Sequence, residues 1–206
     1  MIVVAAALAV AAAFFIGAIP FGVIVGRLFY RTDVRKAGSG NIGAANALRT
    51  LGRRGAIAVL LLDALKGALP TLLVERFGGG MALASAVAFA AVMGHCYSPF
   101  LGGKGGKGVA TSYGAVWALS WPAGVTFTFV WIVALLASGF ASVASMAASV
   151  AMPFALWFTI GFPGLGYGLA SALFIIYAHR ENIARLAAGT ESVLPIFSKR
   201  SGSASR

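Results

Sequence analysis

Long apolar runs, separated by glycine, proline and charged residues, set the hydrophobic pattern of this chain. The stretch from Met1 to Gly26 has no charged side chain, and the stretch from Gly108 to His179 contains no Asp, Glu, Lys or Arg. A run of about 20 apolar residues is long enough to cross a bilayer as an α-helix. Divided at its breaks, the pattern predicts seven membrane-spanning helices, over residues 2–26, 55–74, 81–97, 106–120, 123–138, 141–160 and 165–180.

The composition agrees with a membrane protein. Hydrophobic residues make up 60% of the 206 residues and charged residues only 10%, and the mean hydropathy is +0.91. A soluble core cannot use so much apolar surface. No Lys or Arg precedes the first run, so we expect a retained helix rather than a signal peptide. We predict an all-α integral membrane protein, with one polytopic domain over residues 1–192 and a disordered basic tail over residues 193–206.

The basic residues gather on one side of the predicted helices. If the N-terminus lies outside, 14 of the 16 Lys and Arg residues fall on one face, only Arg76 falls on the other, and Lys66 lies inside a span. Basic loops are typical of the cytoplasmic side of a membrane, so this asymmetry predicts an outside N-terminus and a cytoplasmic C-terminus. The net charge of +11 then reflects topology, and we expect no nucleic acid as a partner.

The first polar cluster is the segment Gly38–Arg49. Its spacing matches the dinucleotide fingerprint G-x-G-x-x-G, but a charged segment precedes it in place of an apolar strand, so the match carries no weight. What remains is a glycine-rich turn with hydrogen-bond donors and one arginine, which is suited to bidentate contact with phosphate. A plain polar loop between helices is the alternative interpretation.

The second cluster is His95 followed by the Gly/Lys run Gly102–Gly108. Five glycines and two lysines in seven residues predict backbone N–H groups curled around an anion. The run is no Walker A loop, because no glycine stands five positions before either Gly-Lys pair. A flexible linker whose lysines reach toward water is the other interpretation.

The third cluster lies where the last span ends and includes His179, Asn182, Arg185 and Glu191. Residues three apart share a helix face, so His179 and Asn182 point the same way. Both histidines of the chain therefore map to the same membrane face as the other clusters, which indicates a site. Two histidines without a nearby carboxylate pair predict no metal.

Two charged residues, Asp63 and Lys66, lie three apart inside the second predicted span. Each costs about 2.5–3.5 kcal/mol at mid-membrane on insertion scales. We expect them to form a structural ion pair, with a direct substrate role as the alternative.

Three blocks of the chain resemble the bacterial acyl-phosphate:glycerol-3-phosphate acyltransferases: Gly38–Arg49, Gly94–Thr111 and His179–Glu191. The segment Leu62–Gly67 is also similar to this family, and the resemblance covers about residues 10–191. One departure is Ala45, where the family often has Thr. If that hydroxyl contacts phosphate, its absence costs about 1 kcal/mol.

The resemblance implies transfer of a fatty acyl group from a long-chain acyl phosphate to the 1-hydroxyl of glycerol 3-phosphate. This reaction gives 1-acyl-glycerol 3-phosphate and phosphate, without a cofactor, as a step of phospholipid biosynthesis. The implied partners are the two substrates and membrane lipids. The implied place is the bacterial cytoplasmic membrane, with the active site on the cytoplasmic side. The resemblance leaves the oligomeric state open.

Carried over residue by residue, the resemblance assigns phosphate binding to Ser39, Gly40, Asn41, Asn46, Arg49, Lys104, Gly105, Gly106, Lys107 and Asn182. Catalytic roles fall to His95, His179 and Ser39, although Ser39 suits a hydrogen bond to phosphate better than nucleophilic attack. The phosphate of the substrate is an alternative base. Structural support is expected from Asp63, Lys66, Arg185 and Glu191.

A transporter or channel for an organic phosphate would use a similar basic mouth. It would also need polar residues across the bilayer, and the spans after Lys107 offer only Ser, Thr and aromatic side chains. A scaffold function would not explain why three polar clusters lie on one face of the membrane. The sequence therefore favours the acyltransferase.

Overall fold

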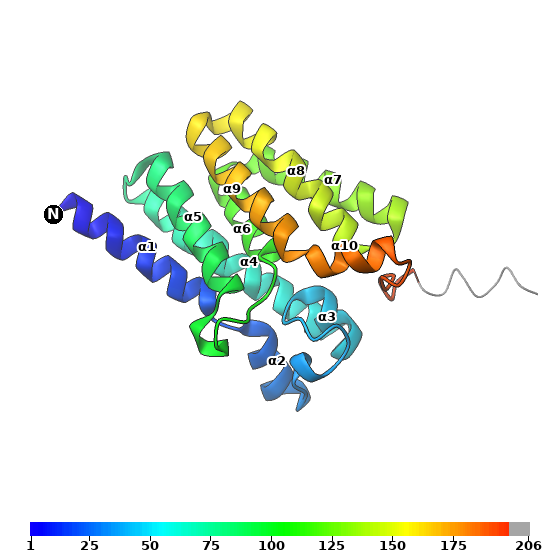
Figure 1. Cartoon of the computed structure of the whole chain (residues 1–206). Coiled ribbons are helices and arrows are strands. Elements are labelled where there is room, and N and C mark those ends of the chain that lie inside the picture. The colour runs from blue at the N-terminus through cyan, green and yellow to red at the C-terminus, as the bar shows by residue number, and fades with distance from the viewer. Residues whose placement is uncertain (198–206) are drawn as a thin grey trace, which may run out of the picture.

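The computed structural model describes residues 1–197, and every regular element in that range is helical (Figure 1). In chain order the elements are α1 (Ile2–Ala18), α2 (Phe21–Tyr30), the 3-10 helix η1 (Val34–Lys36), α3 (Ala44–Thr50), α4 (Gly52–Arg76), α5 (Gly80–Cys96), the 3-10 helix η2 (Pro99–Leu101), α6 (Val109–Leu119), α7 (Trp121–Ser138), α8 (Ala141–Ile160), α9 (Phe162–Ala178) and α10 (Arg180–Ala187). The predicted all-α class is confirmed.

Each predicted span has a helical counterpart, but fewer helices are long enough to cross a bilayer unaided. Within residues 1–197, five segments meet the length and hydropathy needed, namely α1 with α2, α4, α5 with η2, α7 and α8. Helices α9 and α10 form a sixth candidate that bends by 54°, and α6 is a shorter apolar helix. Seven crossings therefore stays a prediction.

The first predicted span, residues 2–26, is broken into two helices. Helix α1 ends at Ala18 and α2 begins at Phe21, because Pro20 has no N–H to donate and its ring clashes with the preceding turn. At this break the carbonyl of Ile19 accepts hydrogen bonds from Lys66 Nζ of α4 at 2.9 Å and from the N–H of Phe21 at 3.1 Å. A charged residue of the second span thus caps the broken end of the first.

Glycines let two pairs of helices cross with their backbones almost touching. A Cβ atom added to Gly17 of α1 or Gly94 of α5 would lie 2.1 or 1.9 Å from a carbonyl oxygen of the other helix. The same holds for Gly67 of α4 and Gly114 of α6, at 2.0 and 1.9 Å. Close approach through small residues is a main source of helix association in membranes, and here it locks α1 to α5 and α4 to α6.

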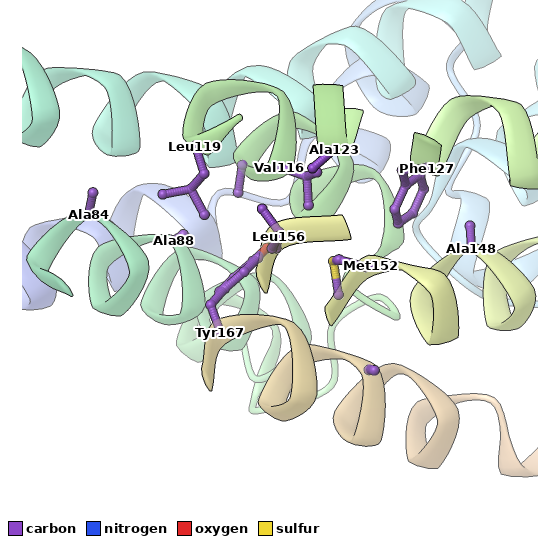
Figure 2. Close-up of a cluster of buried hydrophobic side chains, with 12 residues drawn as sticks. Ala84, Ala88, Val116, Leu119, Ala123, Phe127, Ala148, Met152, Leu156 and Tyr167 are labelled. Atoms are coloured by element: carbon purple, nitrogen blue, oxygen red, sulfur yellow. The ribbon is translucent and has the colours of Figure 1, made fainter. Parts of the chain in front are cut away.

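The largest buried cluster joins α5 and α6 to the layer of α7, α8 and α9 (Figure 2). Phe127 comes from α7, Met152 and Leu156 from α8, and Tyr167 from α9, and each is at most 3% exposed. The hydroxyl groups of Tyr167 and Ser112 lie 2.8 Å apart, which satisfies both inside this core. The cluster holds α6 and α7 in place around the cavity described below.

The disordered tail expected from residue 193 stays a prediction, and the structure describes contacts of its first residues with the bundle. Leu194 is 5% exposed and packs with Leu135 and Ala144, and its N–H donates to the carbonyl of Gly139 at 3.0 Å. Burial of this apolar side chain helps to hold residues 193–197 against the bundle. The rest of the predicted tail, residues 198–206, lies outside the described residues.

Candidate active site

The three polar clusters of the sequence meet around one open cavity of about 710 Å³. Its polar end is lined by Ser39, Asn41, Asn46, Arg49, Asp63, His95, Lys107, Ser142, His179, Asn182, Arg185, Glu191 and Ser192. Helices α3, α4, α5 and α10 and the loops beside them supply most of these residues. The structure therefore brings together residues more than 140 positions apart, as a single site requires.

Asn46 shapes the first loop through the hydrogen bonds of its side-chain amide. Its Oδ1 accepts a hydrogen bond of 2.8 Å from the N–H of Ser39. Its Nδ2 donates to the carbonyls of Val34, Ala37 and Asn41 at 2.8, 3.1 and 2.7 Å. Asn46 is 1% exposed and its amide is fully used by the backbone, so a phosphate contact through Asn46 stays a prediction.

Some other residues of the first cluster line the cavity, whereas others form hydrogen bonds within the loop. Ser39, Asn41 and Arg49 line the cavity, as expected of phosphate ligands. Gly40 does not line it, and its N–H donates to the carbonyl of Ala37 at 3.1 Å. That donor closes a turn within the loop, and the predicted phosphate contact through Gly40 stays a prediction.

Two glycines of the Gly/Lys run, Gly105 and Gly106, pack closely against the end of α5. The N–H groups of Gly105 and Gly106 donate to the carbonyls of Cys96 and His95 at 2.9 and 3.0 Å. A Cβ atom on Gly106 would lie 2.0 Å from His95 Nε2. Lys104 is exposed, and neither it nor these two glycines lines the cavity. Phosphate binding by these three residues stays a prediction, and of the polar side chains of the run only Lys107 lines the cavity.

Lys107 belongs to a hydrogen-bonded network with the third cluster. Its Nζ donates to Oδ1 of Asn182, and Nδ2 of Asn182 donates to Oε1 of Glu191 at 2.5 Å. Ser142 Oγ donates to the same carboxylate oxygen at 2.8 Å, and Arg185 Nε donates to Oε2 at 2.7 Å. Glu191 thus braces the cluster, and the network fixes Lys107 in the cavity wall.

The charges of this network suit an anionic ligand. Burial, followed by repulsion from Arg185, lowers the pKa of Lys107 to about 8. Burial alone would raise the pKa of Glu191, but the hydrogen bonds from Asn182, Ser142 and Arg185 outweigh it and lower that pKa below its ordinary value. At neutral pH Lys107 is therefore mostly cationic while the carboxylate that braces it stays ionised.

Both histidines line the cavity, and each is 3% exposed. His179 Nδ1 lies 2.8 Å from the carbonyl of Ile175. Because a carbonyl oxygen only accepts hydrogen bonds, Nδ1 carries the proton and Nε2 keeps its lone pair. His95 Nδ1 lies 3.7 Å from Asp63 Oδ1, beyond hydrogen-bond distance. His179 is therefore the better oriented of the two candidate bases.

Asp63 and Lys66 form the expected ion pair within α4. Lys66 Nζ lies 2.7 Å from Asp63 Oδ1, and both side chains are 1% exposed. Lys66 lies away from the cavity, whereas Asp63 lines it and its Oδ2 has no hydrogen-bond partner in the described chain. Lys66 therefore has a structural role, whereas Asp63 also forms part of the cavity wall.

The cavity continues into an apolar end that the sequence did not single out. Tyr113 of α6 and Phe127, Thr128, Trp131 and Ile132 of α7 line this part. They fall within a nearly uniform apolar stretch, where no contrast between positions marks one face as the wall of a pocket. Ser142, Ser145 and Ser192 were missed for a related reason, because isolated serines carry no motif.

The helices define an integral membrane protein of known fold. The glycerol 3-phosphate form of PlsY, an integral membrane glycerol 3-phosphate acyltransferase, matches with a TM-score of 0.88 and 36% identity, covering 95% of this chain and 98% of that chain. Its lysophosphatidic acid form matches with a TM-score of 0.83, covering 92% and 95%.

Sequence comparison gives the particular family. The family model for glycerol-3-phosphate acyltransferase matches residues 7–189. A glycerol-3-phosphate acyltransferase of Brucella anthropi is 43% identical over 180 residues, covering 87% of this chain and 88% of the relative. One of Methylorubrum populi is 48% identical, with coverage of 85% and 86%. The chain belongs to the glycerol-3-phosphate acyltransferase family.

Proposed function

We propose that this cavity transfers a fatty acyl group from an acyl phosphate to the 1-hydroxyl of glycerol 3-phosphate, releasing phosphate and 1-acyl-glycerol 3-phosphate. The supporting observation is that one cavity is lined both by the charged residues Arg49 and Lys107 and by the aromatic residues Tyr113 and Trp131. Such a shape suits one ligand that joins a phosphate to a fatty chain and a second that is only a small phosphate. The similar structures in glycerol 3-phosphate and lysophosphatidic acid forms support the acceptor and the product.

The chemistry asks for orientation and charge more than for a strong base. The glycerol oxygen bonds to the acyl carbon, the bond from that carbon to the phosphate oxygen breaks, and the electron pair leaves with phosphate. Acyl phosphate is an activated anhydride, so holding the leaving phosphate with Arg49 and Lys107 accounts for much of the catalysis. The hydroxyl proton passes to His179, to His95 or to a substrate phosphate. No step needs a cofactor.

We place the site at the cytoplasmic surface of a bacterial inner membrane. The basic residues near the cavity, with Arg76 alone at the opposite end of α4, support this orientation. The apolar end of the cavity would then lie at the depth of the lipid chains, where a fatty acyl group partitions.

The direct test gives purified protein palmitoyl phosphate and labelled glycerol 3-phosphate, beside palmitoyl-CoA as the rival donor. We expect lysophosphatidic acid from palmitoyl phosphate only. Absence of product with both donors would exclude the acyltransferase reaction. Product from palmitoyl-CoA alone would assign the chain a different donor.

Site variants tie the reaction to this cavity. We expect Arg49→Ala and Lys107→Ala each to lower turnover by at least about a hundredfold, because each variant loses a charged contact to phosphate in the transition state. Arg53→Ala and Lys104→Ala are the matched controls, because both residues are exposed and lie off the cavity. Loss of activity in Lys104→Ala with retention in Lys107→Ala would reverse the assignment.

The proton acceptor needs a separate measurement. We expect His179→Ala to lose the acidic limb of the pH–rate profile and His95→Ala to keep it, given the oriented Nδ1 of His179. Retention of the limb in both variants would assign the proton to a substrate phosphate.

A further inference from the structure

The chain between Ser192 and Phe197, here called the strap, crosses from the third polar cluster to the turn between α7 and α8. Figure 1 shows this last described stretch beside α3 and the end of α7. Its anchor is Leu194, whose N–H donates to the carbonyl of Gly139 at 3.0 Å. Leu194 is 5% exposed, while the residues on either side of it are exposed. The buried side chain of Leu194 and its backbone hydrogen bond are therefore central contacts between the strap and the bundle, and Phe197 packs against the same cluster.

The anchor also reaches the first polar cluster. Leu194 is buried with Leu135 of α7 and Ala144 of α8, and Leu48 of α3 packs against this group. The next residue of α3 is Arg49, whose Nη2 donates to the carbonyl of Ser192 at 3.1 Å. Two successive side chains of α3 are thus held by the strap, one by packing and one by a hydrogen bond.

The carbonyl of Ser192 is a suitable partner for an arginine that must bind phosphate. It takes one of the five N–H groups of the guanidinium and leaves the charge unchanged, whereas a carboxylate there would compete with the substrate. The other hydrogen bond recorded for Arg49, from Nη1 to the carbonyl of Ala45, is longer at 3.5 Å. Both Arg49 and Ser192 line the cavity. The strap follows residue 189, where the match to the family model ends.

We propose that the strap positions Arg49 for the substrate phosphate, with Leu194 as the positioning residue. The proposal rests on the proposed function, in which Arg49 is a phosphate ligand. A long arginine side chain loses considerable rotamer freedom when it binds. A strap that already holds the guanidinium at the cavity wall reduces that loss, so affinity for phosphate depends on a residue that touches no substrate.

The test compares Leu194→Ala with Ile196→Ala, a matched deletion at an exposed position of the same strap. The KM values for glycerol 3-phosphate and for palmitoyl phosphate are measured for each, beside Arg49→Lys. Arg49→Lys identifies the substrate whose phosphate Arg49 binds, because its KM rises in that variant. We expect Leu194→Ala to raise the KM for this same substrate by about tenfold, which corresponds to the loss of one charged hydrogen bond. The KM of the other substrate should change by less than about twofold, Ile196→Ala should equal the wild type, and Leu194→Met should restore binding.

A double-mutant cycle separates positioning from general stability. If Leu194 acts through Arg49, the effect of Leu194→Ala on KM disappears in an Arg49→Lys background. Additive effects, unchanged KM values, or a loss confined to kcat would overturn the proposal. If Leu194→Ala cannot be purified, Leu194→Val takes its place in the same cycle. Failure of the wild type and Ile196→Ala to form product would refute the proposed function instead, so the two outcomes are distinct.

Discussion

At the scale of single residues, the cavity depends on a lysine that is buried yet still charged. The hydrogen bond to Asn182 and the braced carboxylate of Glu191 hold Lys107 at the wall, while burial and Arg185 lower its pKa to about 8. A lowered lysine pKa means that the cation is present below pH 8 and is lost as the pH rises beyond it. The phosphate contact should disappear over the same range.

We therefore expect kcat/KM to fall above pH 8 by about tenfold for each pH unit. Lys107→Arg should keep activity and lose this alkaline limb, because a guanidinium stays protonated beyond pH 12. The measurement is a pH–rate profile from pH 6 to 10, corrected for hydrolysis of the donor without enzyme. Lys104→Arg is the control and should follow the wild type. An unchanged limb in Lys107→Arg would assign it to another group.

Residue types alone predicted which segments form the site, but not which atoms stay free. The sequence identified Arg49, Lys107, His179 and Asn182 correctly as residues of one cavity, because charged and polar side chains beside apolar spans are rare. It did not show that the amide of Asn46 donates to backbone carbonyls 12, 9 and 5 residues away. Hydrogen bonds of this kind depend on the folded path of the loop, which composition does not specify.

At the scale of helices, the crossing of α4 and α6 supports the site directly. Helix α4 carries Asp63, and α6 begins two residues after Lys107, so the cavity requires these helices to stay close. Gly114 makes the approach possible, because any Cβ there would lie 1.9 Å from the carbonyl of Ala64. The contact is backbone against backbone, and no rotamer change can relieve it.

We expect Gly114→Ala to destabilise the protein by about 1–3 kcal/mol and to lower activity, as overpacking forces the helices apart. Gly166→Ala is the matched control in α9, since a Cβ there has nothing within 4 Å. Thermal unfolding in detergent and the acyltransferase assay measure the two effects. Equal unfolding temperatures for Gly114→Ala and the wild type would show that the crossing tolerates a larger side chain.

The approximate positions of the long helices follow from the apolar runs, but which of them form the walls of the cavity does not. Helix α7 is apolar all round, so neither Trp131 nor Thr128 stands out from its neighbours. The break at Pro20 was readable in principle, because proline ends helices. The hydrogen bond from Lys66 of α4 to the carbonyl of Ile19 at this break could not be predicted, because it depends on how the two helices pack.

At the scale of the whole molecule, the orientation in the membrane follows from the distribution of basic residues. Arg76 and Lys104 are exposed and lie on opposite predicted sides. We expect Arg76→Cys, in a Cys96→Ala background, to react with an impermeant maleimide in intact spheroplasts, and Lys104→Cys to react only after permeabilisation. Both variants should keep acyltransferase activity. The reverse labelling pattern would invert the proposed topology.

The contact between Lys66 and Ile19 also bears on how the chain is made. On a ribosome the first apolar segment leaves the translocon with a proline break, and the next long segment carries Asp63 and Lys66. Neither is well suited to partition into lipid alone, since an ionised group at mid-membrane costs about 2.5–3.5 kcal/mol. Together they satisfy one another through Asp63, Lys66 and Ile19. Biogenesis of this protein is thus best served by release of the two segments as a paired hairpin.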